Sequence, residues 1–118
     1  MVVSTYQAAS GAGAAAMAEL EQQTREVLEG KEPTCDIFPR QYAFNIFSHN
    51  APITETGYNE EEMKMVKETH KIWNNPNVQI AATCVRVPVM RAHAESINLE
   101  LENPMDEKEA KELLSKSA

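Results

Sequence analysis

The chain has 118 residues, of which 42% are hydrophobic, and 18 acidic against 11 basic residues give it a formal net charge of -7. That length fits one domain with a small core. The acidic balance disfavours nucleic acid as a partner, because no basic stripe offsets it. No apolar run approaches the roughly 20 residues that span a bilayer, and the N-terminus lacks the regions of a signal peptide. We therefore expect neither a nucleic-acid nor a membrane role.

The first third of the chain predicts a strand followed by a helix. Residues 2–9 are rich in β-branched and aromatic side chains, which are typical of a strand. The stretch 10–13, SGAG, breaks that strand; Ser10 is expected to cap the next helix and Gly30 to end it. Side chains at helical spacing should face the core. They are Met17, Leu20, Thr24, Val27 and Leu28.

The middle of the chain predicts a second strand over 42–47 and a second helix that begins at Asn59. Three glutamates follow Asn59, where the helix dipole favours negative charge. The sequence Asn-Asn-Pro-Asn over 74–77 should end this helix. Its expected apolar stripe consists of Met63, Val66, His70 and Trp73.

The last third predicts two strands and a short helix. The strands cover 78–89 and 96–102, and the second alternates apolar with polar residues, so one of its faces should be solvated. Asp106 with Glu109 resembles a capping box for a helix that ends near Leu114. The order β-α-β-α-β-β-α predicts an α+β fold, in which a mixed or antiparallel sheet carries helices on one face.

Residues 84–93, CVRVPVMRAH, crowd a thiol, two guanidinium groups and an imidazole into one stretch. Cys84 and His93 could form a nucleophilic pair, but a cysteine within a strand is more often a small buried hydrophobe. Arg86 at a strand end suits capture of a carboxylate or phosphate, although the pattern alone favours a surface salt bridge. His93 lies at a turn, where functional side chains gather, although a lone histidine there is ordinarily structural or exposed.

Other candidate sites are weaker. Glu61 and Lys64 share a helix face, which ordinarily indicates a solvated ion pair. The stretch 10–13 could offer N–H groups to an anion, but it lacks the lysine of a P-loop and the third glycine of a dinucleotide fingerprint. His49 and His70 show no ligand spacing with the third histidine, so we expect no zinc site. The two cysteines, Cys35 and Cys84, are expected to be reduced thiols.

Four stretches resemble, in chain order, successive blocks of aspartate-semialdehyde dehydrogenase. They are TYQAASGAG, FPRQYAFNIFSHN, NEEEMKMVKETHKIW and ATCVRVPVMRAHAES. The resemblance covers essentially the whole chain and looks plant-like. It implies that residues 1–118 are a single, partial dimerisation and catalytic domain. That family catalyses the NADP-dependent reductive dephosphorylation of aspartyl 4-phosphate to aspartate 4-semialdehyde, on the route to lysine, methionine and threonine.

The resemblance also implies roles for five residues. Gln7 would orient the acyl intermediate, and His93 would be the acid/base. Arg86 would bind the substrate carboxylate. Glu61 and Lys64 would contact the substrate's amino group and its phosphate.

The family's nucleophilic cysteine and its NADP-binding Rossmann domain have no counterpart in these residues. We therefore expect Cys84 not to be the nucleophile, no cofactor to be bound by this fragment, and the fragment to be inactive alone. One alternative is a non-catalytic dimerisation module that pairs with itself or with a full-length subunit. The other is an independent thiol enzyme using Cys84 and His93. The expected location is a plastid or the cytoplasm, with no targeting segment in the chain.

Overall fold

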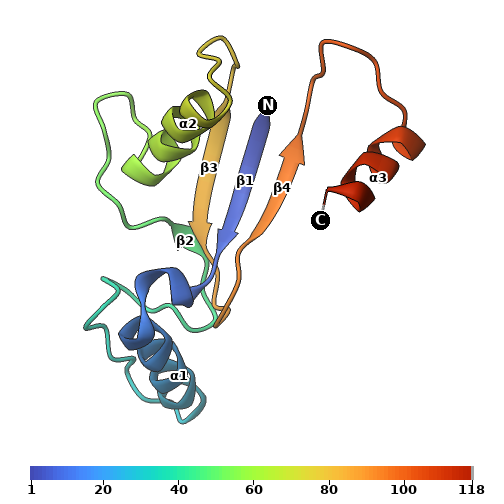
Figure 1. Ribbon diagram of the computed structural model, residues 1–118. Helices are drawn as coiled ribbons and strands as arrows, with labels where there is room; N and C mark the ends of the chain where they lie inside the picture. The colour runs from blue at the N-terminus through green and yellow to red at the C-terminus, as the bar shows by residue number, and fades with distance from the viewer. Residues whose placement is uncertain (118) are drawn as a thin grey trace.

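A computed structural model describes residues 1–117, which form a four-stranded mixed sheet and three α-helices (Figure 1). The α+β class with a mixed sheet is therefore confirmed. The strands are β1 (Val2–Gln7), β2 (Phe47–Ser48), β3 (Ala81–Arg86) and β4 (Ala94–Asn98). The helices are α1 (Ala14–Leu28), α2 (Glu60–Ile72) and α3 (Glu107–Lys116), and a 3-10 turn, Ala9–Ala12, separates β1 from α1.

The strands lie in the order β2-β3-β1-β4. The two central strands, β1 and β3, are parallel, and their last residues, Gln7 and Arg86, are register partners. β2 runs antiparallel to β3 and pairs Phe47 with Arg86. Because the carboxyl ends of parallel strands meet at one edge of a sheet, and ligands bind there in open α/β sheets, this edge is where a site is expected.

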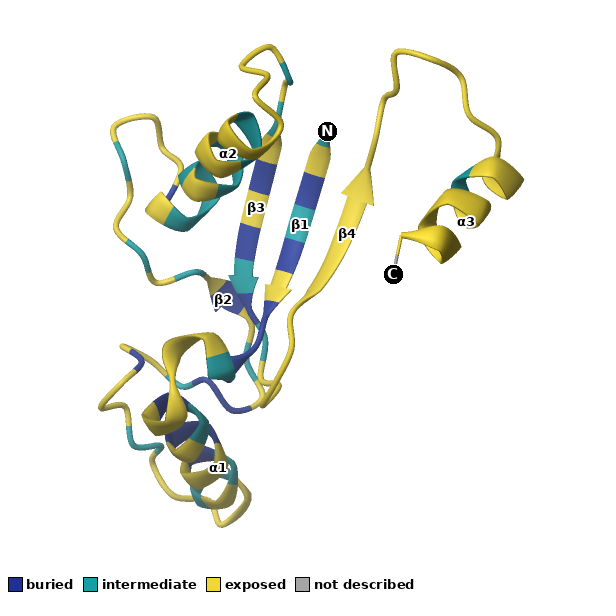
Figure 2. Ribbon diagram, in the orientation of Figure 1, coloured by how far each residue is buried: buried dark blue, intermediate teal, exposed yellow. Residues whose placement is uncertain are grey.

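One face of the two central strands is covered and the other is bare (Figure 2). The covered face packs against α2, which contacts β3. Its buried residues are Val3, Thr5, Gln7, Ala82, Cys84 and Arg86. On the bare face Val2 and Tyr6 are exposed, and β4 is exposed along its whole length.

The hydrophobic core lies beyond the carboxyl edge of the sheet, where α1 packs against the segment that leads to β2 (Figure 1). Its buried members are Ala9, Ala16, Leu20, Phe38, Tyr42, Ala43 and Phe47. The rings of Phe38 and Tyr42 meet edge to face at 4.6 Å, and Tyr42 meets Phe47 in the same way at 5.5 Å. Such aromatic pairs contribute about 0.5–1.5 kcal/mol each beyond the area they bury.

The second predicted strand, 42–47, is wrong for most of its length, because only Phe47 of that range lies in β2. The backbone N–H groups of Tyr42 and Ala43 donate to the side chain of Gln23 and not to a neighbouring strand. Phe44 has a φ of 58°, which no strand residue adopts. The aromatic residues that suggested a strand are core side chains on an irregular segment.

The start and the stripe of α1 also differ from the prediction. Ser10 lies in the 3-10 turn, and Gly13, with a φ of 95°, precedes the helix without a side-chain cap. Leu28, predicted to face the core, is 74% exposed, whereas Glu19, which lies outside the predicted apolar stripe, is buried. Gly30 follows the helix with a φ of 72°, as its predicted role as a C-terminal stop requires.

Both later helices begin where the sequence predicts. The Asn59 side chain accepts the N–H of Glu62, and the Glu62 carboxylate accepts the N–H of Asn59, both at 2.9 Å. The Asp106 side chain caps α3, which extends two residues past Leu114. Trp73, predicted to lie in the apolar stripe of α2, is 56% exposed and follows the helix as its C-cap.

The two strands predicted in the last third are shifted or shortened. β3 keeps only the middle of 78–89. It ends at Arg86, two residues before Pro88, which has no N–H to donate to a ladder. β4 begins two residues before Ser96 and ends before Leu99 and Leu101. Within residues 1–117 no helix is long and apolar enough to cross a membrane.

Candidate active site

Arg86 is a buried cation at the carboxyl edge of the sheet, with only 5% of its surface exposed. Its Nη1 donates to the Ala8 carbonyl and its Nε to Asn50 Oδ1, both at 3.3 Å. The guanidinium lies over the Phe38 ring, 5.6 Å from its centroid. No carboxylate among the described residues forms a salt bridge with it, so the expectation of a surface salt bridge is wrong. A buried charge without a counter-ion is costly, and this site would gain from an anion.

His93 lies in the connection between β3 and β4, beside the same edge. Its Nδ1 accepts the backbone N–H of Ala8 at 3.0 Å. A ring nitrogen that accepts carries no proton, so the neutral imidazole holds its proton on Nε2. A Cβ added to Gly11 would lie 3.2 Å from His93 Nε2 and 3.7 Å from Arg86 Nη1. The imidazole and the guanidinium therefore flank one point, where glycine leaves room for both.

Gln7, Glu61 and Lys64 form a chain of side-chain hydrogen bonds next to Arg86 and His93. Gln7 Nε2 donates to Glu61 Oε1 at 3.2 Å, and Lys64 Nζ donates to Glu61 Oε2 at 3.0 Å. Burial raises the pKa of Glu61, but the hydrogen bonds from Lys64 and Gln7 outweigh it, and the pKa lies below its usual value. Gln7 is 6% exposed, and its Oε1 has no hydrogen-bond partner among the residues that the structure describes. Since buried acceptors are ordinarily satisfied, this oxygen points to a missing donor.

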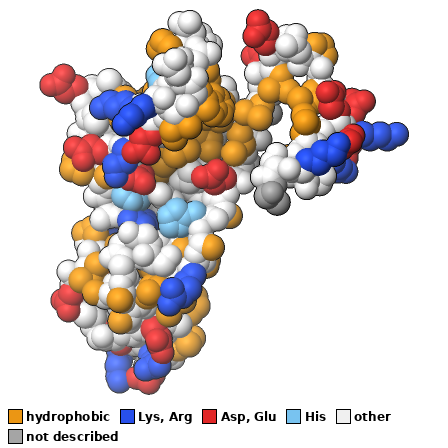
Figure 3. All heavy atoms as spheres, viewed as in Figure 1, with side chains coloured by type: hydrophobic (Ala, Val, Ile, Leu, Met, Phe, Trp, Pro, Cys, Tyr) orange, Lys and Arg blue, Asp and Glu red, His pale blue; other side chains and the backbone are white. Residues whose placement is uncertain are grey.

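The five residues singled out from the sequence thus gather at one edge of the sheet. Arg86 and His93 both hydrogen-bond to the backbone of Ala8 and both lie next to Gly11. Gln7, the register partner of Arg86, links them to the Glu61–Lys64 pair on α2 through its hydrogen bond to Glu61. Figure 3 shows histidine and basic side chains gathered at the narrow waist between the sheet and the α1 region. The roles that the resemblance implies for them stay predictions.

The family model for the semialdehyde dehydrogenase dimerisation domain matches residues 1–118. The chain belongs to that family. It is 55% identical to the aspartate-semialdehyde dehydrogenase of Synechocystis sp. over 99% of this chain and 35% of that protein. It is 54% identical to the enzyme of the same name from Prochlorococcus marinus, over 100% of this chain and 34% of that protein. The chain therefore spans about a third of the length of these curated relatives.

A solved structure shares the fold of this semialdehyde dehydrogenase chain. It is aspartate semialdehyde dehydrogenase II from Vibrio cholerae, whose crystal structure is described as complexed with ASA. The two superpose with a TM-score of 0.95 at 41% identity, over 98% of this chain and 34% of that one. The identification of the family from the four sequence blocks is thereby confirmed.

Cys84 does not take part in the site of this semialdehyde dehydrogenase chain. The residue is 1% exposed, and its backbone N–H donates to Glu62 Oε1 at 3.0 Å. Burial raises the pKa of the thiol, whereas nucleophilic cysteines have lowered values. The interpretation of Cys84 as a small buried residue is confirmed, and its burial with a raised pKa disfavours it as the nucleophile of an independent thiol enzyme.

The sequence reasoning gave no role to His49, although it lies within electrostatic range of the site. Its Nδ1 accepts the N–H of Ala51 at 3.1 Å, so its neutral ring also carries the proton on Nε2. Burial lowers the pKa of His49, and the charge of Arg86 lowers it further. It lines a hollow of about 270 Å³ together with Arg40, Phe47 and Asn50. The motif FSHN was visible in the sequence, but nothing in its spacing pointed to Arg86.

The glycine-containing stretch 10–13 does not fit a dinucleotide. The N–H groups of Ser10 and Gly13 donate to the carbonyls of Met90 and Ser10, both at 3.0 Å, so they are not free for a pyrophosphate. The space at Gly11 is bounded by His93 and Arg86. No group of three or more metal-ligating side chains occurs within residues 1–117.

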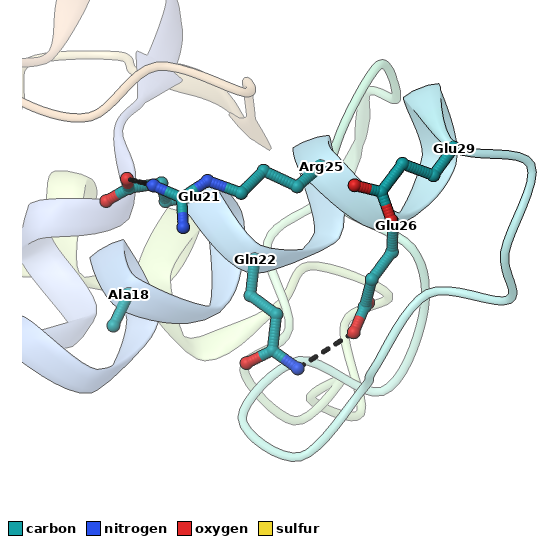
Figure 4. Close-up of a pocket in the computed structure, with 6 residues that line it drawn as sticks. All are labelled: Ala18, Glu21, Gln22, Arg25, Glu26 and Glu29. Atoms are coloured by element: carbon teal, nitrogen blue, oxygen red, sulfur yellow. Dashed lines mark hydrogen bonds and ion pairs between the residues drawn. The ribbon is translucent and has the colours of Figure 1, made fainter.

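A larger hollow of about 450 Å³ lies on the outer side of α1, away from the site (Figure 4). It is lined by Ala18, Glu21, Gln22, Arg25, Glu26 and Glu29. Its charges are already engaged, because Arg25 pairs with Glu21 and the Glu26 carboxylate accepts from Gln22 and Thr34. This hollow is a solvated helix face with no group left to hold a ligand.

Proposed function

We propose that residues 1–118 form the substrate-binding and dimerisation part of an aspartate-semialdehyde dehydrogenase. One observation carries the proposal: within residues 1–117, Arg86 is a buried cation without a carboxylate partner, beside an imidazole whose Nε2 faces the same point. Relatives at 54 and 55% identity bear that enzyme's name, which supports the reaction class.

The substrate of this reaction, aspartyl 4-phosphate, carries a carboxylate, an ammonium group and an acyl phosphate. Arg86 binds the carboxylate, because a guanidinium fork matches its two oxygens. Glu61 takes the ammonium group, and Lys64, held at 3.0 Å from Glu61, takes the phosphate as a point charge. The lowered pKa of Glu61 keeps that carboxylate charged at neutral pH.

His93 exchanges the proton of the reaction at Nε2, since its Nδ1 is engaged by Ala8. The unpartnered Oε1 of Gln7 orients the acyl group by accepting from it or from its nucleophile. The attacking thiol and the NADP site come from parts of the enzyme that residues 1–118 do not match. These residues alone therefore bind substrate without turning it over.

A non-catalytic dimerisation module is the second candidate, and the bare sheet face favours it. Val2 and Tyr6 are exposed on that face, and β4 offers an unpaired edge. The partner is a second copy of this chain or a full-length subunit. The named relatives are bacterial, so they lend no support to a plastid, and the compartment stays a prediction.

The test is a titration of the 118-residue chain with L-aspartate, which carries the carboxylate and the ammonium group of the substrate, followed by NMR. Signals of Arg86 Nε–H and of the Glu61–Lys64 pair should shift together with one dissociation constant. The His70 ring, whose Nε2 is bonded to the Val78 carbonyl, should not respond. If the chain is only a dimerisation module, L-aspartate should cause no shift at Arg86. That outcome would reject the substrate clamp.

A further inference from the structure

Two polar side chains of α1 are buried where a helix ordinarily packs apolar ones. Glu19 is 5% exposed, and Gln23 is fully buried. Glu19 accepts the backbone N–H groups of Asp36, Ile37 and Phe38 at 2.7, 2.5 and 2.9 Å. A buried carboxylate is tolerable because charge-assisted bonds of this kind satisfy it. Glu19 thus fixes three consecutive residues of a segment that has no secondary structure.

Gln23 holds the same segment from the next turn of the helix. Its Oε1 accepts the N–H groups of Tyr42 and Ala43 at 2.6 and 3.1 Å, and its Nε2 donates to the Thr34 carbonyl at 2.6 Å. Gln23 Nε2 also reaches Glu19 Oε1 at 3.4 Å. The two side chains therefore replace, for residues 34–43, the backbone partners that a strand would have supplied.

The segment 34–43 touches the proposed substrate clamp at two points. The Phe38 ring supports the Arg86 guanidinium from one side at 5.6 Å. The Tyr42 hydroxyl hydrogen-bonds to the carbonyls of Gln7 and Val87, the residues beside Arg86 in the sheet and in the chain. The Phe38 and Tyr42 rings pack edge to face at 4.6 Å, so the two points are in direct contact and form one packed unit.

We propose that Glu19 and Gln23 are positioning residues for Arg86, acting through Phe38 and Tyr42. This inference rests on the proposed function, in which Arg86 binds the substrate carboxylate. Glu19 and Gln23 act on Arg86 indirectly. They fix the segment 34–43, and the Phe38 ring of that segment supports the Arg86 guanidinium. A purely structural role for Glu19 would lower stability without changing the orientation of Arg86.

The test uses the 118-residue chain with three single variants and one double variant. Glu19→Gln weakens the hold on the segment, and Phe38→Leu removes the aromatic face while keeping an apolar side chain of similar size. Glu21→Gln, on the exposed side of the same helix, is the matched control. The readouts are the NMR signal of Arg86 Nε–H without ligand, the dissociation constant for L-aspartate and the melting temperature.

Glu19→Gln and Phe38→Leu should each move the Arg86 signal and weaken L-aspartate binding about tenfold, a loss between those of an exposed and of a fully desolvated cation–π contact. The double variant should lose no more than either single one, since both act on one unit. Glu21→Gln should change nothing. Unmoved Arg86 signals with parental affinity, or losses that multiply, would overturn the proposal.

Two further outcomes are also decisive. If the parent chain binds no L-aspartate, the substrate clamp fails, while the ligand-free Arg86 signal still decides whether Glu19 positions this side chain. If Glu19→Gln does not fold, Phe38→Leu decides, because it leaves the hydrogen bonds of the segment in place. A dissociation constant for L-aspartate that Phe38→Leu leaves unchanged would then reject the role of the segment.

Discussion

At the residue scale, the chemistry of the site follows from burial of charges that the sequence pattern alone assigns to the surface. Arg86 lies on the covered face of the sheet, and its donors go to a carbonyl and an amide oxygen. In His93 and His49 alike, Nδ1 accepts a backbone N–H, which leaves Nε2 for another partner. A neutral imidazole next to the buried guanidinium of Arg86 suits proton transfer close to a bound anion.

His49 should make stability depend on pH between neutrality and mild acid. Burial, and then Arg86, lower its pKa from the usual 6.5, so the unfolded chain binds this proton more readily than the folded one. Stability should therefore fall as the pH drops through and below 6.5. The lowered pKa of Glu61 acts at lower pH, because stability from that carboxylate is lost only below its usual 4.5.

Urea unfolding of the chain and of His49→Asn, between pH 7 and pH 5, measures this effect. The asparagine Oδ1 can still accept the Ala51 N–H but does not titrate, so the variant should lose less stability over this range. Parallel pH profiles for the two proteins would show that His49 titrates alike in both states.

At the element scale, the pieces that sequence reasoning found are those fixed by local signals. The start of α2 at Asn59, the glycine after α1 and the strand segments around TYQ and CVR depend on neighbouring residues, whereas the parallel pairing of β1 with β3 is non-local and was not predicted. The predicted second strand failed because a side chain of α1, Gln23, takes the amides that a strand would pair. Gln23 lies about 20 residues before Tyr42 and Ala43 in the chain, and no local sequence pattern indicates this contact.

The same contrast applies to the site. The family resemblance singled out Arg86, His93, Gln7, Glu61 and Lys64, and the structure gathers them at the carboxyl edge of the sheet. Glu19 went unnoticed, since a glutamate at that position of a helix reads as a solvated residue until its three backbone donors are seen.

Removing the N-cap of α2 should cost more than removing that of α3. Asn59 is 1% exposed and takes part in a complete capping box, so Asn59→Ala should lower the free energy of unfolding by about 1–2 kcal/mol. Asp106→Ala is the matched control: the residue is exposed, and its loss should cost about 0.5 kcal/mol. Chemical denaturation of both variants gives the comparison, and equal losses would contradict the larger contribution expected from the buried, complete capping box of α2.

At the scale of the whole molecule, the chain is more extended than a self-contained domain. Its radius of gyration is 17.6 Å, against roughly 13 Å for a compact chain of about this length. In Figures 1 and 2, α3 stands off the sheet beyond β4, and both are exposed. An unpaired strand edge and exposed apolar side chains favour contact with another chain.

The isolated chain should therefore not stay a clean monomer. Light scattering at micromolar concentration should report a dimer or larger species, because the bare face and the β4 edge are uncovered. Tyr6→Glu, which places a charge on the bare face, should shift the population toward monomer. A well-folded monomer for the parent chain, unchanged by a full-length relative, would reject the dimerisation proposal.

The most direct test of the central claim is steady-state kinetics of a chimera. Residues 1–118 replace the matching third of the Synechocystis enzyme, with which they share 55% identity. The chimera should reduce NADP with aspartate 4-semialdehyde and phosphate, whereas the 118-residue chain alone should not. Arg86→Lys should raise KM about tenfold or more with a smaller change in kcat, and His93→Gln should lower kcat roughly a hundredfold. A folded, active chimera whose KM is indifferent to Arg86→Lys would contradict the account.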